Sequence, residues 1–451
     1  MNQTLKVGIS GVRGIVGESF TPQLAASFAQ AFGTFAGRGP VLVGRDTRPS
    51  GPMFEQAVVA GLESVGCRPV LAGVLPTPTL LMLTPHLGAR GAIAITASHN
   101  AAPWNALKFA DRRGLFLSPA RAEELFDLYH QRDFPLVPEP ELPRADLCER
   151  GFDEHARRVA AFVDAPAIRR RRFRVVVDAV NGVGALFSAP LLRDVLGAEV
   201  RVLHGEPSGR FERGPEPVAE NLRALGEAVV RDGADVGFAQ DPDGDRLAMV
   251  SEMGEAIGEF YTLAFAIQQV LARGSRAPVV MTLSSSKTVE AAARAAGAGV
   301  IRTRIGEIHV SEAMLRAGAA VGGEDNGGVI VPAIHPCRDS FGAMAVILER
   351  LCSTGRTVSQ LRDALPRYHL RREKFPAGAS EAPERLRRLR RAYASLSPDL
   401  TDGVYVDFGT GWIHARRSNT EPVIRVSAED VTPEAANARM ADARAHLGFE
   451  L

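Results

Sequence analysis

The sequence predicts an α/β protein built from several domains. Short apolar runs alternate with stretches of helical periodicity along the chain, which is the pattern of strands joined by helices. At 451 residues the chain is long enough for two to four domains with sizeable cores. A Pro-rich stretch at 134–143 is typical of a linker and closes the first unit, residues 1–145.

The first unit contains the apolar runs and amphipathic stretches expected of alternating strands and helices. Its predicted strands are 41–43, 69–71 and 92–95. Its predicted helices are 21–35, 51–65 and 118–130.

Three further units follow, with predicted limits of 146–254, 255–366 and 367–451. In the second we expect helices from about 153 and at 185–192 and 220–231, and strands at 173–177 and 200–203. In the third we expect strands at 279–281 and 300–303 and a helix at 288–296, and in the fourth strands at 403–407 and 412–415 and a helix at 433–447.

A weak repeat of topology links the first three units. In each, a polar loop follows an apolar strand and the chain returns in a short strand, at 106–109, 247–250 and 329–331. Functional groups gather at strand ends in open α/β sheets, so these loops predict a composite site between domains.

The hexapeptide Asp241–Arg246 carries the strongest chemical signal in the chain. Asp241, Asp243 and Asp245 alternate with Pro and Gly, between apolar runs that predict a buried hairpin. Converging carboxylates repel one another unless a hard cation such as Mg²⁺ lies among them. The alternative of an EF-hand calcium loop has Glu252 at the twelfth position, but Arg246 stands where that loop requires Gly.

Composition excludes several classes of protein. The formal net charge of +1 argues against bulk attraction to nucleic acid or anionic membranes, and no apolar run approaches a membrane span. The N-terminus lacks an apolar signal core, and the four cysteines are scattered without paired spacing. We therefore expect a cytoplasmic protein with unpaired thiols, no nucleic acid and no membrane partner. The sequence gives no indication of the oligomeric state.

Ser98 lies just after the predicted strand at 92–95. It could serve as a helix N-cap, or it could carry a phosphoryl group that completes the cation site. The hydrolase motif G-x-S-x-G is absent, and His99 adjoins Ser98 too closely in the chain to serve easily as its base.

Three other loops are rich in groups that bind anions or cap turns. Residues 417–422, with Arg425 beyond, combine Arg forks and small hydroxyls suited to a phosphate dianion, although a surface turn is equally compatible. The segment 8–14 is Gly-rich with one Arg, and 44–51 is typical of a capped turn with a local ion pair.

Together these motifs resemble the α-D-phosphohexomutase superfamily, over nearly the whole chain and in the right order. The matching segments are 10–14, 43–51, 96–100, 241–246, 323–328 and 417–425. The resemblance implies four domains around a central cleft, three similar mixed α/β units and a C-terminal α+β domain that closes over the substrate. It implies an isomerase of carbohydrate metabolism that moves a phosphoryl group between the 1- and 6-positions of a hexose phosphate.

The resemblance also assigns the phosphoryl-transfer residues. Ser98 matches the phosphoserine, and its phosphate with Asp241, Asp243 and Asp245 matches the ligands of one Mg²⁺ per chain. Arg246 resembles the loop Arg near the transferring phosphate. A hexose 1,6-bisphosphate is then the reaction intermediate and an activator.

Other matches concern proton transfer and substrate binding. Arg13 and Lys108 resemble residues that assist proton transfer near Ser98, with His99 a further catalytic candidate; burial near other cations is expected to lower the pKa of Lys108. Glu324 and Asn326 match the sugar-recognition loop. The residues that match the clamp on the non-transferred phosphate are Arg417, Ser418, Asn419, Thr420 and Arg425.

Departures from the superfamily pattern bear on specificity. Asn326-Gly327-Gly328 replaces the common Ser-Gly-His, and with Arg338-Asp339 further on it looks more like the archaeal-type phosphoglucosamine mutase branch. Glu307 and His309 are open candidates for a position facing the cleft. The predicted substrate is glucosamine phosphate, with glucose or mannose phosphates as alternatives.

Two other classes of function use the same residues. A metal-dependent sugar phosphatase would pass the phosphoryl group to water, and a non-catalytic sensor would only bind the sugar phosphate. The distal clamp around Arg417 favours the mutase over the phosphatase, and the intact Ser98 and Asp triplet argue against the sensor.

Overall fold

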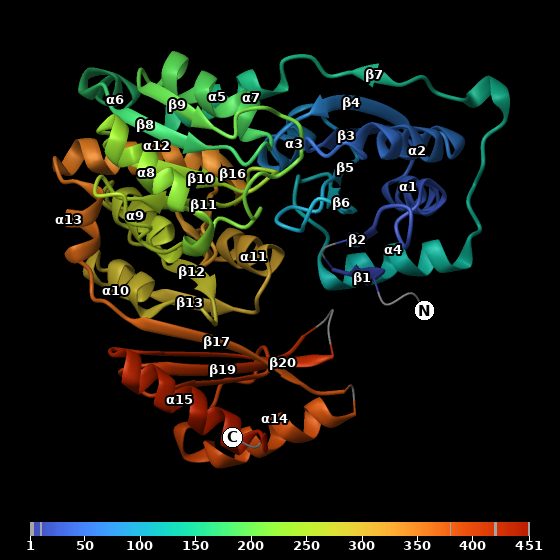
Figure 1. Cartoon of the computed structure of the whole chain (residues 1–451). Coiled ribbons are helices and arrows are strands. Elements are labelled where there is room, and N and C mark those ends of the chain that lie inside the picture. Colours follow the sequence, from blue (N-terminus) through green and yellow to red (C-terminus); the bar gives the residue numbers. More distant parts are fainter. Residues whose placement is uncertain (1–3, 10, 379, 419–421, 450–451) are drawn as a thin grey trace.

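The computed structural model describes residues 4–9, 11–378, 380–418 and 422–449. Its strands form four separate sheets, one in each of four consecutive domains, which we call domains I to IV in chain order. Domain I lies beside domains II and III, and domain IV lies below them in Figure 1. Among the described residues no helix has both the length and the apolar character needed to span a membrane.

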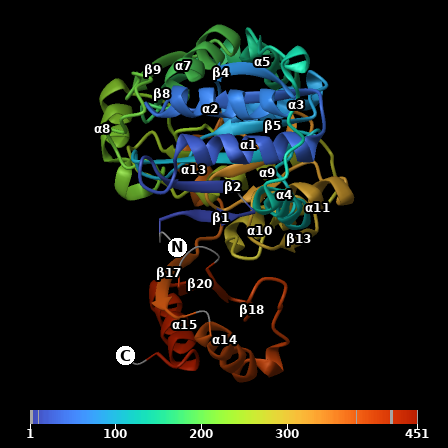
Figure 2. The same cartoon turned by 90° about the vertical axis from the view of Figure 1, so that its right-hand side faces the viewer.

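Domain I contains a seven-stranded mixed sheet. In spatial order its strands are β1 (Lys6–Gly8), β2 (Gly11–Ile15), β6 (Trp104–Asp111), β5 (Gly91–Ile95), β3 (Pro40–Arg45), β4 (Arg68–Val74) and β7 (Asp146–Leu147). Its helices are α1 (Pro22–Ala36), α2 (Gly51–Ser64), α3 (Thr77–His86) and α4 (Pro119–Gln131). Helices α1 and α2 pack side by side on one face (Figure 2). Because β3 and β5 are parallel neighbours, the loops that follow them meet at one edge.

Domain II contains a four-stranded sheet in which the predicted acidic hairpin is confirmed. The strand order is β11 (Leu247–Val250), β10 (Val236–Gln240), β8 (Arg174–Asp178) and β9 (Glu199–Leu203). Its helical segments are α5 (Gly151–Phe162), α6 (Ala165–Arg171), α7 (Gly184–Ala189), the π-helix η2 (Pro190–Val195) and α8 (Arg223–Asp232). Strands β10 and β11 pair antiparallel around residues 241–246, with Gly244 at φ 74°.

Domain III repeats this plan with a five-stranded sheet. The strand order is β13 (Val300–Thr303), β12 (Val279–Thr282), β14 (Gly322–Glu324), β15 (Gly328–Val331) and β16 (His335–Arg338). Its helices are α9 (Phe260–Leu271), α10 (Lys287–Ala295), α11 (Glu307–Ala317), α12 (Ser340–Thr354) and α13 (Val358–Asp363). The polar segment 322–328 comprises β14, the turn 325–327 and the first residue of the antiparallel strand β15.

Domain IV is a small α+β unit. Its antiparallel sheet has the order β17 (His369–Pro376), β20 (Val423–Asp430), β19 (Trp412–Arg417) and β18 (Val404–Asp407). Among its described residues, the α-helices are α14 (Glu381–Ala392) and α15 (Pro433–His446).

The apolar cores show which domains pack together. One continuous buried cluster runs from domain I through domain II into domain III, with members such as Leu80, Phe238 and Phe341. Domain IV has a core of its own. A small cluster that includes Leu283 and Trp412 joins domain IV to domain III. The first three domains therefore form one packed body, and domain IV is attached to it through a smaller contact.

Candidate active site

Ser98 lies in the loop after β5, at the contact between domains I and II. Its hydroxyl donates a 2.7 Å hydrogen bond to Asp241 Oδ2, so the predicted seryl oxygen reaches the acidic hairpin. Ser98 is buried, 6% exposed, with the left-handed backbone angle φ 48°. No helix begins at Ser98, so the N-cap alternative is wrong.

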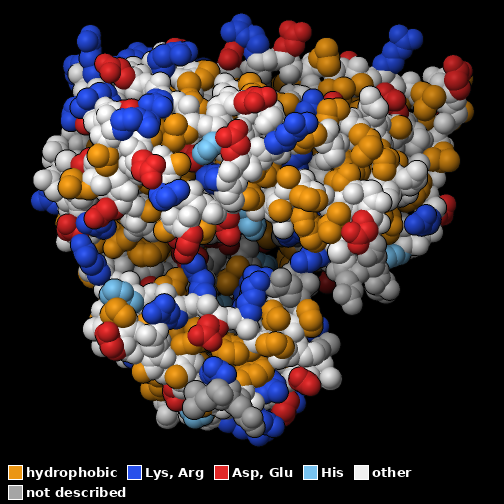
Figure 3. All heavy atoms as spheres, in the orientation of Figure 1, with side chains coloured by type: hydrophobic (Ala, Val, Ile, Leu, Met, Phe, Trp, Pro, Cys, Tyr) orange, Lys and Arg blue, Asp and Glu red, His pale blue; other side chains and the backbone are white. Residues whose placement is uncertain are grey.

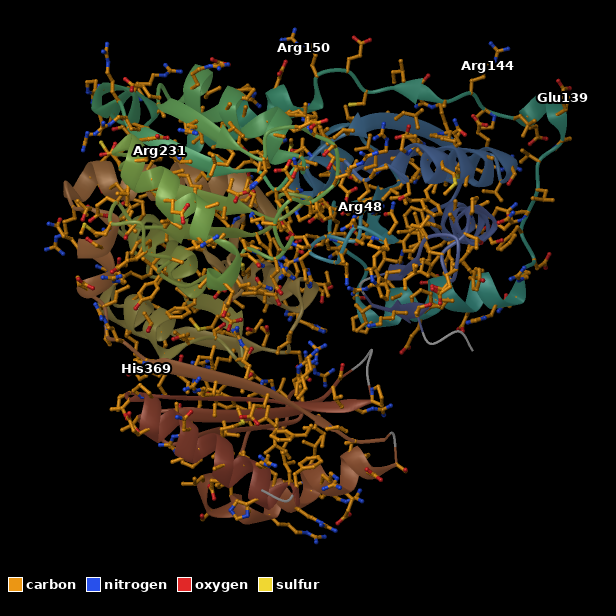
Figure 4. The ribbon with its side chains drawn as sticks, in the orientation of Figure 1. Arg48, Glu139, Arg144, Arg150, Arg231 and His369 are labelled. Carbon is orange, nitrogen blue, oxygen red and sulfur yellow. The ribbon has the colours of Figure 1, made fainter. Side chains whose placement is uncertain are left out.

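Arg48 holds the loop that carries Ser98. Its buried guanidinium donates to the carbonyl oxygens of Ser98 (2.8 Å), Asn100 (2.7 Å) and Trp104 (2.8 Å), and it pairs with Asp46 at 3.0 Å. Figure 4 places Arg48 between the ribbons of domains I and II. The sequence predicted the local ion pair in this turn, but not the clamp on the Ser98 loop.

The three aspartates of the hairpin 241–246, here called the metal loop, converge on one point. One carboxylate oxygen from each residue lies within 4.8 Å of the oxygens from the other two, and all three side chains are buried. Burial, then the charges of Asp245 and Asp243, raise the pKa of Asp241. Burial opposes charge on Asp243, but the Lys108 ammonium outweighs it and lowers the pKa of Asp243. The buried carboxylates therefore repel one another, and a bound cation would offset this repulsion.

Two oxygen atoms of the triplet fit an incoming cation. Asp243 Oδ1 and Asp245 Oδ1 are buried and accept no hydrogen bond from any residue that the structure describes. The second oxygens are held in place: Asp243 Oδ2 accepts from Thr77 at 2.9 Å and from Lys108 at 2.8 Å. Oxygen-only donors with orphaned atoms suit Mg²⁺, which the three aspartates would hold together with the Ser98 oxygen or its phosphate.

The candidates for proton transfer surround the same point. Lys108 lies 2.8 Å from Asp243 and 4.0 Å from Asp245. Burial lowers its pKa, but these carboxylates outweigh burial and raise it, so the expected lowering of the Lys108 pKa is wrong. His99 Nδ1 is 3.4 Å from Ser98 Oγ, and burial together with nearby cations lowers the His99 pKa to about 2. Arg13 donates to the Asn100 side chain at 3.2 Å.

Arg338 joins the metal loop to domain III, which the sequence did not predict. It lies at the end of β16 and is 9% exposed. Its guanidinium donates to Asp245 Oδ2, to Glu307 Oε2 at 3.1 Å and to Glu324 Oε2 at 2.6 Å. A lone Arg far from each of its partners leaves no local sequence pattern that could have revealed it.

The segment 322–328, here called the sugar loop for the role that the resemblance implies, is close to the metal loop. Glu324 is 5% exposed and also accepts from Gly306 N at 3.0 Å. The Asn326 side chain accepts from Gly328 N at 3.2 Å, so one of its functions is to shape the loop. Glu307 is buried against Arg338, and burial raises its pKa to about 7. His309, on the first turns of α11, is partly buried.

The predicted phosphate clamp belongs to domain IV. Arg417 ends β19 and is exposed, Ser418 is buried, and Arg425 lies on the neighbouring strand β20. Asn419 and Thr420 lie outside the described residues, as does Ser10 of the first Gly-rich segment.

Cations from three domains lie near one another at the site. Burial, then the charges of Arg246 and Arg425, lower the pKa of Arg13. Arg246 donates to Glu216 at 2.9 Å. A hollow between domain IV and the body above it is visible in Figure 3, with Lys and Arg side chains at its rim. Clustered guanidinium groups beside an open space favour binding of an anion such as phosphate.

Comparison with known families covers almost the entire chain. Four phosphoglucomutase/phosphomannomutase domains match in order: α/β/α domain I at residues 4–136, α/β/α domain II at 153–254, α/β/α domain III at 260–368 and the C-terminal domain at 374–447.

Individual relatives agree with this match. A phosphoglucomutase/phosphomannomutase of Thermococcus kodakarensis is 36% identical over 447 residues, covering 95% of both chains. A probable phosphoglucosamine mutase of Methanopyrus kandleri is 36% identical over 434 residues, covering 95% of this chain and 94% of its own. The crystal structure of a phosphoglucomutase/phosphomannomutase family protein from Burkholderia thailandensis superposes with a TM-score of 0.87 at 25% identity, covering 100% and 98% of the two chains.

Proposed function

Because the chain belongs to the phosphoglucomutase/phosphomannomutase family of phosphohexomutases, which are isomerases, we propose that it moves a phosphoryl group between the 1- and 6-positions of a hexose phosphate through Ser98. The observation that carries the proposal is the 2.7 Å hydrogen bond from Ser98 Oγ to Asp241, inside a cluster of three buried aspartates. A seryl oxygen so placed can accept and release a phosphoryl group beside a bound cation.

The reaction consists of two transfers. In the first, a sugar hydroxyl attacks the phosphorus of phosphorylated Ser98 and the bond from phosphorus to the seryl oxygen breaks. The proton of the attacking hydroxyl passes to the departing seryl oxygen, which yields a hexose bisphosphate and the free Ser98 hydroxyl. The bisphosphate then turns around in the cleft, and its other phosphoryl group returns to Ser98. Asp241, Asp243 and Asp245 would hold Mg²⁺, which would neutralise charge on the transferring group.

Each protein group has a task that follows from its surroundings. Lys108, whose pKa is raised by Asp243 and Asp245 against the effect of burial, contributes positive charge. His99, with a pKa near 2, remains neutral beside Ser98 and is able to accept a hydrogen bond. Arg246 and Arg13 attract the phosphoryl oxygens, and domain IV supplies Arg417 and Arg425 for the phosphate that is not transferred.

The sugar would lie between the two phosphates, against Glu324 and the rest of the sugar loop. We propose glucosamine phosphate as the preferred substrate, since the 36% identical relative of Methanopyrus kandleri is named a probable phosphoglucosamine mutase. Glucose and mannose phosphates are the alternative, because the Thermococcus relative of equal identity is named for them. The Glu324 carboxylate would accept hydrogen bonds from an amino group or from hydroxyls.

Steady-state kinetics with the 1-phosphates of glucosamine, glucose and mannose test the proposal. We expect conversion to the 6-phosphates, faster with a trace of the matching 1,6-bisphosphate, and the highest kcat/KM for glucosamine 1-phosphate. Ser98→Ala is expected to lower kcat at least about 10³-fold, and mass spectrometry should find phosphate on Ser98 only in the unaltered protein. Steady release of inorganic phosphate would instead support a phosphatase, and absence of phosphate on Ser98 would contradict the phosphoserine route.

A further inference from the structure

Arg338 contacts both halves of the proposed site at once. Its Nη2 donates to Asp245 in the metal loop of domain II, and its Nη1 donates to Glu324 in the sugar loop of domain III at 2.6 Å. We propose that Arg338 is a positioning residue that couples cation binding at the Asp triplet to hexose phosphate binding at the sugar loop. This inference rests on the proposed function, because it takes the cation and the sugar phosphate as the two ligands.

The two oxygens of Asp245 have separate roles. Oδ2 accepts from Arg338, whereas Oδ1 is buried and has no hydrogen-bond donor among the described residues. The bond to Arg338 therefore selects the carboxylate orientation in which Oδ1 remains available to the ion. A cation among the aspartates would add to Arg338 without displacing it.

Glu324 is oriented by the same guanidinium. Its Oε2 accepts from Arg338 and its Oε1 accepts from Gly306 N at 3.0 Å. With both oxygens held, the carboxylate presents only its remaining lone pairs to a sugar. Restraint of Asp245 by a cation therefore also restrains Glu324 through Arg338.

Glu307 also holds Arg338 in place. Its Oε1 accepts from the Arg338 backbone N at 3.0 Å and its Oε2 from Nε at 3.1 Å. The guanidinium thus binds one carboxylate through Nε, one through Nη1 and one through Nη2. A planar fork can keep three bonds in fixed directions, which a single Lys ammonium on a flexible stem cannot do. Burial of the whole group strengthens these bonds.

The expected coupling is positive. A cation that fixes Asp245 also fixes Arg338 and Glu324, so the sugar phosphate then has less side-chain freedom to remove on binding. By linkage, the sugar phosphate must tighten cation binding by the same factor.

Mn²⁺ titration by calorimetry, with and without saturating glucosamine 6-phosphate, tests this inference on the full-length protein. In the unaltered protein we expect glucosamine 6-phosphate to lower the Mn²⁺ Kd by at least about 5-fold, and Mn²⁺ to lower the Kd of the sugar phosphate equally. In Arg338→Met, the factor by which each ligand lowers the Kd of the other should fall below about 2-fold while Mn²⁺ still binds. In Arg338→Lys this coupling factor should lie between the values for Arg338→Met and the unaltered protein. An Arg338→Met protein that keeps the full factor would overturn the inference.

Arg372→Met is the matched control. Arg372, from β17 of domain IV, pairs with Asp325 of the same sugar loop at 2.7 Å instead of with the metal loop. Its loss should weaken glucosamine 6-phosphate binding and leave the coupling factor unchanged. A factor that falls equally in Arg372→Met would also overturn the inference, because any damage to the sugar loop would then suffice.

A second variant guards against misfolding. Arg338→Met leaves Glu307 buried without its cation, so the double variant Arg338→Met/Glu307→Gln removes the orphaned charge and should show the same loss of coupling. If neither Met variant folds, the charge-conserving variant Arg338→Lys provides the test. An unchanged coupling factor in Arg338→Lys would show that the planar guanidinium is not required, and would overturn the inference. Failure of the unaltered protein to bind or convert hexose phosphates would instead contradict the proposed function.

Discussion

Ser98 has a backbone conformation that few residues with a side chain adopt. Its φ of 48° lies in the left-handed region, where a Cβ is disfavoured by about 1 kcal/mol or more. Arg48 offsets this cost by binding the carbonyl oxygens around it, including those of Ser98 and Asn100. The strain and its restraint aim the Ser98 hydroxyl at Asp241.

Arg48→Lys should therefore impair catalysis more than folding. The ammonium can keep the pair with Asp46 but cannot reach the several carbonyl oxygens at once, so the loop loses its fixed shape. We expect kcat to fall about 10²-fold, as for a misplaced reacting group, with Mn²⁺ affinity retained within a few-fold.

Arg45→Lys is the control for this change. Arg45 ends β3, three residues before Arg48, and its side chain pairs with Glu55 at 3.2 Å instead of with the carbonyl oxygens of the Ser98 loop. Its kcat should stay within about 2-fold of the unaltered protein. Equal losses in the two variants would contradict the role given to Arg48.

Removal of Mg²⁺ should lower thermal stability. A ligand at one hundred times its Kd stabilises the folded state by about 2.7 kcal/mol, so Tm should rise by a few degrees when Mg²⁺ replaces a chelator. Asp241→Asn should abolish this rise and leave Tm in chelator equal or higher, because burial and its neighbours already raise the Asp241 pKa towards the neutral form. Differential scanning calorimetry measures both effects.

Asp232→Asn provides the comparison for the metal test. Asp232 is partly exposed at the end of α8 and pairs with Arg201 at 2.9 Å. This variant should keep the full Mg²⁺ response. If Mg²⁺ still raises the Tm of Asp241→Asn, the ion binds at a site other than the aspartate triplet.

At the scale of residues, local patterns were predictable and distant partners were not. Alternating aspartates between apolar runs indicated a cation site, and the structure brings Asp243 and Asp245 together as buried groups with orphaned oxygens. Arg338 was noted only as a family marker, because nothing near it in the chain indicates that it reaches Asp245 and Glu324. The Lys108 pKa was predicted with the wrong sign, since its partner carboxylates come from another domain.

At the scale of elements, many strands and amphipathic helices were predicted, but helices α9, α11, α12 and α14 and strands β17 and β20 were missed. The central strands β3, β5 and β10 and the return strands β6, β11 and β15 lie where the apolar runs predicted them. Helices α9 and α12 were not predicted, because most of their residues are buried on every side and give no 3.6-residue alternation. The ends of elements shifted by a few residues, as for α8, which begins at Arg223.

The contact between the sugar loop and the metal hairpin depends on Gly327. Gly327 has φ 86°, its carbonyl accepts from Leu247 N at 3.0 Å, and a Cβ here would clash with the Leu247 backbone. Gly327→Ala should destabilise the protein by more than about 2 kcal/mol and raise KM for the hexose phosphate about 10-fold. Urea unfolding and initial-rate kinetics measure the two effects.

Gly318→Ala is the control that distinguishes backbone strain at positive φ from a steric clash of the added Cβ. Gly318 caps α11 at φ 61°, but a Cβ there meets nothing within 4 Å. We expect a loss of about 1 kcal/mol with an unchanged KM. If both variants behave alike, the close approach to Leu247 is not what matters at Gly327.

At the scale of the whole molecule, buried histidines lie at the junction of the first three domains. His155 of domain II lies 2.8 Å from Thr79 in domain I and 2.9 Å from Asp339 in domain III. His335 of domain III donates from Nε2 to Gly114 O of domain I at 2.8 Å. The order of the domains was predictable from motifs, whereas these contacts across domains were not, because each pairs residues far apart in the chain.

His335 should make the stability of this junction depend on pH. Burial, the largest cause, lowers the pKa of His335 from 6.5 to about 4. Between these two pH values His335 is protonated in the unfolded state but neutral in the folded state. Stability should fall by at most about 3 kcal/mol as the pH drops from about 7 to 4. His335→Gln, whose amide can still donate to Gly114, should flatten this part of the profile.

Urea unfolding at a series of pH values measures the effect. His369→Gln is the control, since His369 is exposed at the start of β17 (Figure 4) and should leave the profile unchanged. A profile that is as steep in His335→Gln as in the unaltered protein would assign the acid sensitivity to other groups.

The gathering of one site from several domains has a consequence for synthesis on the ribosome. Domains fold in order as the chain emerges, and residues 241–245 are translated well before Arg338. A nascent chain that ends after domain II holds this acidic cluster without the guanidinium that later binds Asp245. Free magnesium in the surrounding fluid would compensate that charge during the interval, and so would assist maturation before any turnover begins.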